Sequence, residues 1–304
     1  MRNLDKYKGI LPAFYACYED DGSVSPERVR ALVRYFIAKG VKGIYVNGSS
    51  GECIYLSVAE RKLILENVMA EAKGKLTVIC HVACNNTADS CELAAHAKEQ
   101  GVDAIAAIPP IYFHLPEHAI AAYWNTISEA APDTDFVIYN IPQLAGVTLT
   151  VPLYHKMLEN KNVIGVKNSS MPAQDIQMFE AEGGRDHIIF NGPDEQYVAG
   201  RAIGAHAGIG GTYGVMPELF LKMDETFNQG KMEEAQHIQY DADAVIYKMC
   251  EAKGNLYAVI KEVLRINENL DIGGVRAPLP NLFPEDKAIA EEAARMVREA
   301  RKKL

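Results

Sequence analysis

The sequence predicts an α/β fold: a (β/α)₈ barrel of residues 1–230, followed by a C-terminal three-helix extension of the same domain, residues 231–304. Short apolar runs typical of strands alternate with longer helical stretches up to about residue 230. Strands that are apolar on both faces and separated by helices form parallel sheets. Eight such repeats in about 230 residues match a closed barrel better than an open doubly wound sheet.

Each expected strand is followed by an expected helix. The strands are residues 10–16, 43–46, 76–82, 104–108, 136–139, 163–166, 187–190 and 205–209. The helices are residues 25–39, 57–72, 87–100, 116–131, 151–158, 173–181, 194–203 and 216–228. Several helices begin with a capping residue or a proline, as in Ser25-Pro26 and Leu115-Pro116, which is typical of helix starts.

The remaining residues predict the extension. Its three helices are expected at residues 232–250, 255–266 and 285–302, and the turn Ala277-Pro278-Leu279-Pro280 separates the last two. No interdomain linker or repeat array interrupts the chain, so we expect a single domain. The first strand is not followed by G-x-G-x-x-G, which argues against dinucleotide binding.

The composition indicates a soluble globular protein with a substantial core. Hydrophobic residues make up 48% of the chain and charged residues 23%, and the formal net charge is −9. An acidic chain lacks the basic face that nucleic acid requires, and no apolar run approaches the ~20 residues of a membrane span. The N-terminus leads into no hydrophobic signal segment, and the six cysteines fit neither a disulfide framework nor a zinc site. We therefore expect a cytoplasmic protein without nucleic-acid or membrane partners.

Lys167 is the most informative candidate for catalysis. The active sites of such barrels lie at the carboxyl ends of the strands, and Lys167 directly follows the apolar run 163–166. Burial disfavours the ammonium form and lowers the pKa of a lysine, which leaves a free amine able to attack a ketone. The alternative is a lysine whose stem is buried while its ammonium group reaches solvent.

Gly48-Ser49-Ser50-Gly51, after the second strand, is a candidate anion-binding turn. It offers two hydroxyls, and its glycines let a carboxylate approach the backbone N–H groups. An ordinary polar turn remains the alternative. Asn47 stands where the G-x-S-x-G nucleophile elbow needs glycine, and the chain has no G-x-x-x-x-G-K-[ST], so serine-hydrolase and P-loop functions are excluded.

Two further residue types, tyrosine and histidine, stand at or near the strand ends. Tyr139 and Tyr112 are either proton carriers or packing residues with bonded hydroxyls. His114 and His118 have the i,i+4 spacing of a metal pair, but Pro116 lies between them and no third ligand is evident. We therefore expect no metal site.

Three motifs in this order resemble the dihydrodipicolinate synthase/N-acetylneuraminate lyase family over essentially the whole chain. Gly48-Ser49-Ser50-Gly51-Glu52 is similar to the carboxylate loop G-[ST]-[ST]-G-E of that family. Tyr139-Asn140-Ile141-Pro142 resembles its Y-N-x-P motif, and Gly165-Val166-Lys167 resembles its Schiff-base lysine motif. The resemblance implies a (β/α)₈ barrel and a pyruvate-dependent class I aldolase.

Two positions favour the lyase branch of the family. Leu144 stands where the synthases of lysine biosynthesis usually carry an arginine that binds the second substrate. Asn191-Gly192-Pro193-Asp194-Glu195 resembles the G-x-D-E motif of the lyases. From residue types alone, these acids could also serve a helix N-terminus. Gly211 departs from the lyase pattern, which often has serine there, so that a hydroxyl contact to the sugar is lost.

The resemblance also implies a role for each candidate. Lys167 is the nucleophile, Tyr139 the acid/base, and Tyr112 of a neighbouring subunit completes a hydroxyl relay through Ser49. The substrate carboxylate is bound by the two serines of the turn, and the acyclic sugar by a second set of residues. The expected substrate-binding residues are Ser49, Ser50, Ser169, Gly192, Asp194, Glu195 and Gly211.

The implied reaction is reversible cleavage of N-acetylneuraminate to N-acetylmannosamine and pyruvate by a homotetramer. It requires no metal or organic cofactor, because the lysine amine itself stabilises the carbanion. One alternative is condensation of pyruvate with aspartate semialdehyde, or cleavage of another 2-oxo-3-deoxy sugar acid. An alternative of another class is a non-catalytic protein that binds sugar acids.

Overall fold

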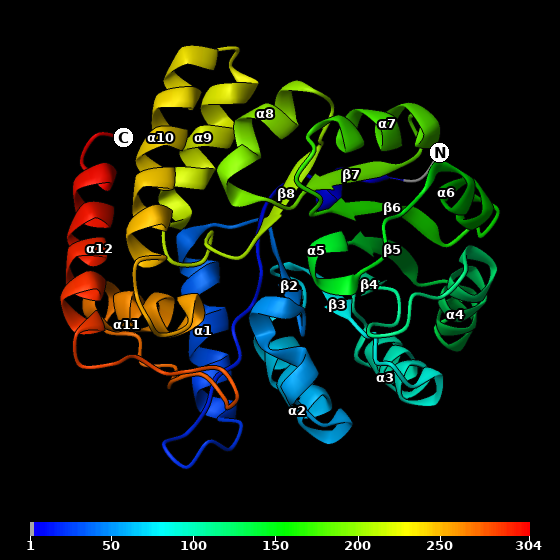
Figure 1. The fold of residues 1–304 in the computed structure, drawn as a ribbon, viewed down its shortest axis with the longest axis horizontal. Coiled ribbons are helices and arrows are strands. Elements are labelled where there is room, and N and C mark those ends of the chain that lie inside the picture. The colour runs from blue at the N-terminus through cyan, green and yellow to red at the C-terminus, as the bar shows by residue number, and fades with distance from the viewer. Residues whose placement is uncertain (1–2) are drawn as a thin grey trace.

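The computed structural model describes residues 3–304, and its centre is one sheet of eight parallel strands (Figure 1). Neighbouring strands follow the order β1-β8-β7-β6-β5-β4-β3-β2. A parallel bridge between Ala13 and Tyr45 joins the β1 side to β2 and closes the barrel. The strands are β1 Gly9–Pro12, β2 Gly43–Val46, β3 Thr77–His81, β4 Ala104–Ala107, β5 Asp135–Asn140, β6 Val163–Asn168, β7 Ile188–Asn191 and β8 Ala207–Gly210. The predicted (β/α)₈ barrel, a TIM barrel, is confirmed.

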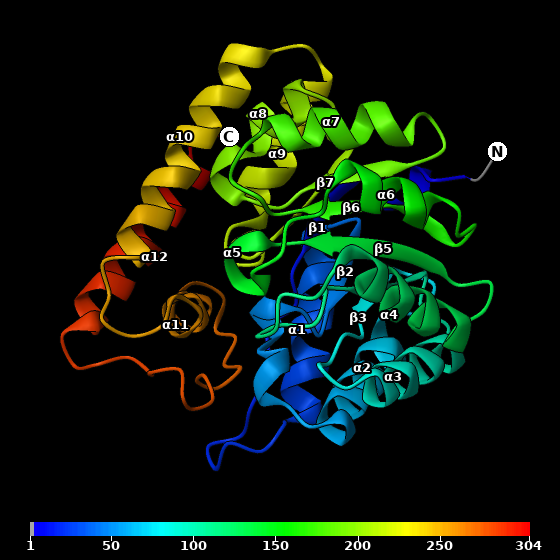
Figure 2. The same ribbon diagram turned by 45° about the vertical axis from the view of Figure 1, so that its right-hand side comes forward.

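Helices surround the strands, and three more lie together on one side of the barrel (Figure 2). The helices of the barrel are α1 Pro26–Lys39, α2 Val58–Ala72, α3 Thr87–Gln100, α4 Glu117–Ala130, α5 Pro142–Ala145, α6 Val151–Leu158, α7 Gln174–Gly183, α8 Tyr197–Ala202 and α9 Pro217–Asn228. Those of the extension are α10 Met232–Met249, α11 Leu256–Glu268 and α12 Asp286–Arg301. Short 3₁₀ helices are η1 Asp5–Tyr7, η2 Ser49–Gly51, η3 Cys53–Tyr55 and η4 Asp194–Gln196.

The helix boundaries follow from local capping. Ser57 and Glu60 form a reciprocal capping box at the start of α2, and the Ser25 side chain accepts the Arg28 N–H at the start of α1. Gly40 ends α1 in the left-handed conformation that glycine adopts without strain. These caps explain why the predicted helix starts lie close to the observed ones.

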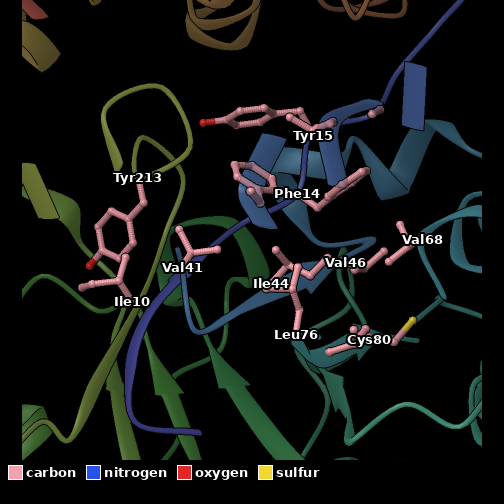
Figure 3. Packing of buried hydrophobic residues seen from close by; sticks show 14 of the residues in the cluster. Ile10, Phe14, Tyr15, Val41, Ile44, Val46, Val68, Leu76, Cys80 and Tyr213 are labelled. Carbon is pink, nitrogen blue, oxygen red and sulfur yellow. The ribbon is translucent and has the colours of Figure 1, made fainter. Parts of the chain in front are cut away.

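The core has two layers, one inside the barrel and one between the barrel and its helices. Figure 3 shows part of the outer layer, which includes Ile10 of β1, Ile44 and Val46 of β2 and Val68 of α2. The inner layer is a separate cluster of side chains that alternate with these along the strands. From the strands it contains Leu11, Tyr45, Ile79, Ala104, Ala106, Val137, Tyr139, Ile164, Ile188, Phe190, Ala207 and Ile209.

Strand β6 departs from regular alternation. Its register with β5 shifts between Phe136 and Val137, so that Ile164 is the extra residue of a β-bulge. Ile164 belongs to the inner layer and Val166 to the outer one. Residues 164 and 167 would face opposite sides of a regular strand. The bulge therefore turns Lys167 toward the barrel interior.

The extension packs against the side of the barrel that carries α8 and α9. Helix α10 contacts α8, α9 and η4, and α12 contacts α9, α10 and α11. Arg301, the last residue of α12, adds ion pairs with Glu218 and Glu268. Within residues 3–304, no helix is long and apolar enough to cross a membrane.

Candidate active site

Lys167 lies at the carboxyl end of β6 with its side chain in the barrel throat. Only 4% of the residue is exposed. Its Nζ atom lies 3.8 Å from the ring centroid of Tyr139 and 4.0 Å from that of Tyr45. The two rings are perpendicular, with centroids 5.7 Å apart. The amine is thus held between two aromatic rings rather than directed to solvent.

This environment lowers the pKa of the Lys167 amine. Burial lowers its pKa to about 7, while the charges of Asp194 and Cys53 act in the opposite direction. About half of such amines are therefore neutral near pH 7. A neutral amine is the form that attacks a carbonyl carbon.

Tyr139 ends β5 directly beside Lys167. The two residues are register partners in the paired strands β5 and β6. Burial raises the pKa of the Tyr139 phenol to about 12, and hydrogen bonds with Ser49 and Ser169 act to lower it. The phenol is therefore protonated at neutral pH and is linked to a serine on either side, an arrangement that can carry a proton.

The two serines of the candidate turn lie in η2, after β2. Ser50 is buried and Ser49 is half-buried. Gly48 is required before them, because a Cβ atom there would lie 2.5 Å from the Tyr45 ring. The turn thus packs on the same tyrosine that contacts the lysine amine, which places both serine hydroxyls at the carboxyl ends of the strands.

Asp194 forms the opposite wall of the site. Its Oδ2 atom accepts hydrogen bonds from the backbone N–H and the hydroxyl of Thr212, each at 2.6 Å. Burial raises the pKa of Asp194 to about 7, although the bonds from Thr212 act against this shift. Glu195 is exposed beside it. Gly192 lets β7 approach Ser169, since a Cβ atom there would lie 2.0 Å from the serine Oγ.

Tyr112 is the one predicted catalytic residue that the fold does not bring to Lys167 in this chain. It is 86% exposed, in the loop between β4 and α4, and its φ of 83° is unusual for a residue with a side chain. Its ring lies edge-on against that of Phe113, which is also exposed. The pair projects away from the protein surface.

Some residues of the site were missed by the sequence reasoning. Tyr45 faces Lys167 from β2, where it appeared as one apolar residue of a buried strand. Tyr257 of α11 receives a hydrogen bond from Ser50 at 3.0 Å, and no local pattern marks it. Thr212 directly follows Gly211 after β8, and a hydroxyl residue at a strand end is a signal that could have pointed to it. In the described part of the chain, no three His, Cys, Asp or Glu residues are arranged to hold a metal ion.

Comparisons with known proteins agree with this geometry. The model of the dihydrodipicolinate synthetase family matches residues 6–298. An N-acetylneuraminate lyase of Mediterraneibacter gnavus is 68% identical over 100% of this chain and 96% of its own length. An N-acetylneuraminate lyase of Citrobacter koseri is 32% identical over 94% of this chain and 96% of its own.

A solved structure is similar along the entire chain. It is a catalytic lysine mutant of the sialic acid aldolase of Ruminococcus gnavus, with a TM-score of 0.99 and 68% identity. The match covers 100% of this chain and 99% of the other.

Proposed function

The chain belongs to the dihydrodipicolinate synthetase family, and we propose that it cleaves N-acetylneuraminate reversibly to N-acetylmannosamine and pyruvate. The observation that carries the proposal is the buried Lys167 amine beside the Tyr139 phenol. The 68% identity to an N-acetylneuraminate lyase along the whole chain supports the substrate. Retention of the lysine, the tyrosine and the serine pair argues against a non-catalytic binding protein.

The first step is attack of the neutral Lys167 amine on C2 of the open-chain sugar acid. Loss of water gives an iminium ion, which draws electrons more strongly than the ketone did. A positive charge is costly in the apolar barrel throat. The iminium ion is therefore stabilised by the nearby acidic group of Asp194 and by the ring faces of Tyr45 and Tyr139. This covalent intermediate needs no metal or organic cofactor.

Cleavage of the C3–C4 bond follows. Tyr139 takes the proton of the C4 hydroxyl as it passes its own proton into the hydroxyl relay. The electron pair of the bond moves to the iminium nitrogen, which leaves an enamine and the aldehyde of N-acetylmannosamine. The enamine then takes up at C3 the proton that the relay returns through Tyr139, and addition of water to the resulting iminium frees pyruvate and the Lys167 amine.

The remaining site residues bind the two ends of the substrate. Ser49 and Ser50 bind the carboxylate, and Ser49 also links Tyr139 to the relay. On the other side, the sugar hydroxyls donate to acidic or backbone acceptors. We assign this role to Ser169, Gly192, Asp194, Glu195 and the backbone of Gly211.

Tyr112 acts from a neighbouring subunit in this proposal. Its exposure and its strained backbone support insertion into another copy of the chain. Further exposed apolar side chains, Ile54, Leu144 and Phe113, are consistent with a covered surface. We propose a homotetramer, and we place it in the cytoplasm because all six cysteines are free.

Borohydride trapping tests the mechanism. Pyruvate and borohydride should add one stable adduct, at Lys167, as mapped by peptide mass spectrometry. Lys261 is equally buried but paired with Glu52, so it serves as an internal control and should stay unmodified. Lys167→Ala should form no adduct and release no pyruvate from N-acetylneuraminate. An unmodified Lys167, or turnover by the alanine variant, would contradict the mechanism.

A substrate panel separates the alternatives that share this lysine. The purified protein should release pyruvate from N-acetylneuraminate and condense pyruvate with N-acetylmannosamine. Robust condensation with aspartate semialdehyde, without sialic acid cleavage, would instead assign synthase activity.

A further inference from the structure

Helix α11 of the extension reaches the serine turn at two points. The Ser50 hydroxyl bonds to the Tyr257 hydroxyl at 3.0 Å, and the Lys261 ammonium bonds to Glu52 Oε1 at 2.9 Å. Tyr257 and Lys261 are four residues apart on α11, so their side chains lie on the same face of the helix. A single helix face thus contacts both ends of the segment from Ser50 to Glu52.

The contact at Glu52 fixes the backbone that follows the serines. Glu52 has a φ of 54°, a left-handed conformation that costs free energy for a residue with a side chain. Its Oε2 atom accepts the Arg276 N–H at 2.8 Å and the Tyr18 hydroxyl at 3.2 Å. Both Glu52 and Lys261 are buried, and Lys261 also donates to the Gly274 carbonyl. Because these partners determine the position of Glu52 so fully, the turn before it is rigid.

The contact at Ser50 lies against Gly211. A Cβ atom on Gly211 would lie 3.2 Å from Ser50 Oγ and 3.3 Å from the Tyr257 hydroxyl oxygen. The Gly211 carbonyl accepts the Tyr15 hydroxyl at 2.7 Å, and the Tyr15 ring lies 6.2 Å from that of Tyr257. The Tyr257 hydroxyl thus lies among Ser50, Gly211 and Tyr15, with Ser50 as its bonded partner.

We propose that Tyr257 is a positioning residue that orients the Ser50 hydroxyl toward the substrate carboxylate. The proposal rests on the function proposed above and extends it to a residue of the extension. In the structure Ser50 donates to Tyr257. Both groups are hydroxyls, so the bond can reverse. Tyr257 then donates to Ser50, and the Ser50 proton points to a carboxylate oxygen.

Tyr257→Phe keeps the ring and removes only the hydroxyl. We expect the KM for N-acetylneuraminate to rise about 3- to 10-fold. The pyruvate concentration that gives half-maximal borohydride trapping should rise by the same factor. The kcat should change less than about twofold. The chemistry at Lys167 is intact in this variant, so the effect falls on binding. Tyr154→Phe is the matched control, because Tyr154 is buried away from the site and its hydroxyl has no partner among the described residues.

A double-mutant cycle with Ser50→Ala identifies the path of the effect. If Tyr257 acts through Ser50, Tyr257→Phe has no further effect on KM when Ser50 is already alanine. An unchanged KM in Tyr257→Phe, a loss confined to kcat, or the same KM increase in the Ser50→Ala background would each overturn the proposal. A wild-type protein that forms no pyruvate adduct overturns the proposed function, and with it this inference. A wild-type adduct with an unchanged Tyr257→Phe variant overturns the inference alone.

Discussion

The reactivity of Lys167 depends on a balance between burial and one nearby carboxylate. Burial lowers the pKa of the amine, and the charge of Asp194 raises it. A more buried amine without that carboxylate would be neutral over a wider pH range. It would, however, lose the acidic group that favours the positively charged iminium. In the proposed mechanism, Asp194 therefore contributes to catalysis as well as to binding of the sugar.

This balance predicts the acid limb of the pH–rate profile. Protonation inactivates the amine, so kcat/KM should fall as the pH drops through about 7, the pKa of Lys167. Asp194→Asn removes a charge that raises this pKa, and the limb should move to lower pH. Glu195→Gln is the control, since Glu195 is not among the groups that shift the lysine. A limb that stays in place or moves to higher pH in Asp194→Asn would contradict the assignment.

Residue types at strand ends predicted that Lys167, Tyr139 and the serine turn lie at the same end of the barrel, and the structure places them there. Their catalytic and binding roles stay predictions. The barrel rule selects the carboxyl ends of strands, and polar residues there are few. Tyr257 could not be found this way, because it reaches Ser50 across 207 residues of sequence. Tyr112 was located correctly in a loop after β4. The proposed insertion of Tyr112 into a neighbouring active site involves a second copy of the chain, which the pattern of a single sequence does not describe.

Strand β6 illustrates what the alternation of side chains cannot predict. The apolar run 163–166 located the strand, but regular alternation from Ile164 would turn Lys167 outward. The bulge that reverses this depends on the register with β5. Gly165 lies next to the extra residue, and a Cβ atom there would lie 1.7 Å from the Ile188 carbonyl oxygen of β7. The glycine is thus needed for the close approach of two strands.

Gly165→Ala should therefore destabilise the protein severely. The Ile188 carbonyl oxygen cannot move without separating β6 from β7. The φ of 154° at Gly165 disfavours alanine as well. We expect a loss of more than about 4 kcal/mol in the free energy of unfolding, measured in urea, or no folded protein. Gly184→Ala is the control: its φ is 67° but nothing lies within 4 Å, so it should cost only about 1–2 kcal/mol. Equal losses in the two variants would contradict the steric argument.

The other elements were predicted to within a few residues, with three exceptions. Strand β1 ends at Pro12 although the apolar run continues to Ala16. Ala13 still forms a bridge to Tyr45, but the chain then leaves the sheet, and Phe14 packs against Phe36 of α1. Residues 194–203 form η4 and then α8 rather than one helix. Helix α5 was not predicted, since a single four-residue turn after Pro142 has no amphipathic pattern.

On the scale of the whole molecule, we propose that barrel and extension unfold as one unit. Helix α10 supports the Asp194 segment, because Gln239 donates to the Asp194 carbonyl and accepts the Val198 N–H. Helix α11 supports the serine turn through Lys261 and Glu52. The extension therefore stabilises two walls of the site. Its role was not evident from its sequence, which shows only amphipathic helices.

A comparison of two probes tests this proposal. Trp124 is the only tryptophan and is buried in α4 of the barrel, so its fluorescence reports the barrel. Far-UV circular dichroism also reports α10, α11 and α12. The two urea transitions should coincide at a fixed protein concentration. A circular-dichroism step that precedes the fluorescence change would indicate an extension that unfolds separately.

The pairing of Glu52 with Lys261 has a consequence for biosynthesis. The two residues are separated by 209 positions, and a ribosome adds about 5–20 residues per second. Roughly 10–40 s therefore pass between the synthesis of Glu52 and that of Lys261. During that interval the nascent barrel carries an unpaired carboxylate where the finished enzyme has a neutralised one. The segment from Ser50 to Glu52 therefore gains this support only with the last quarter of the polypeptide, after every strand has already been made.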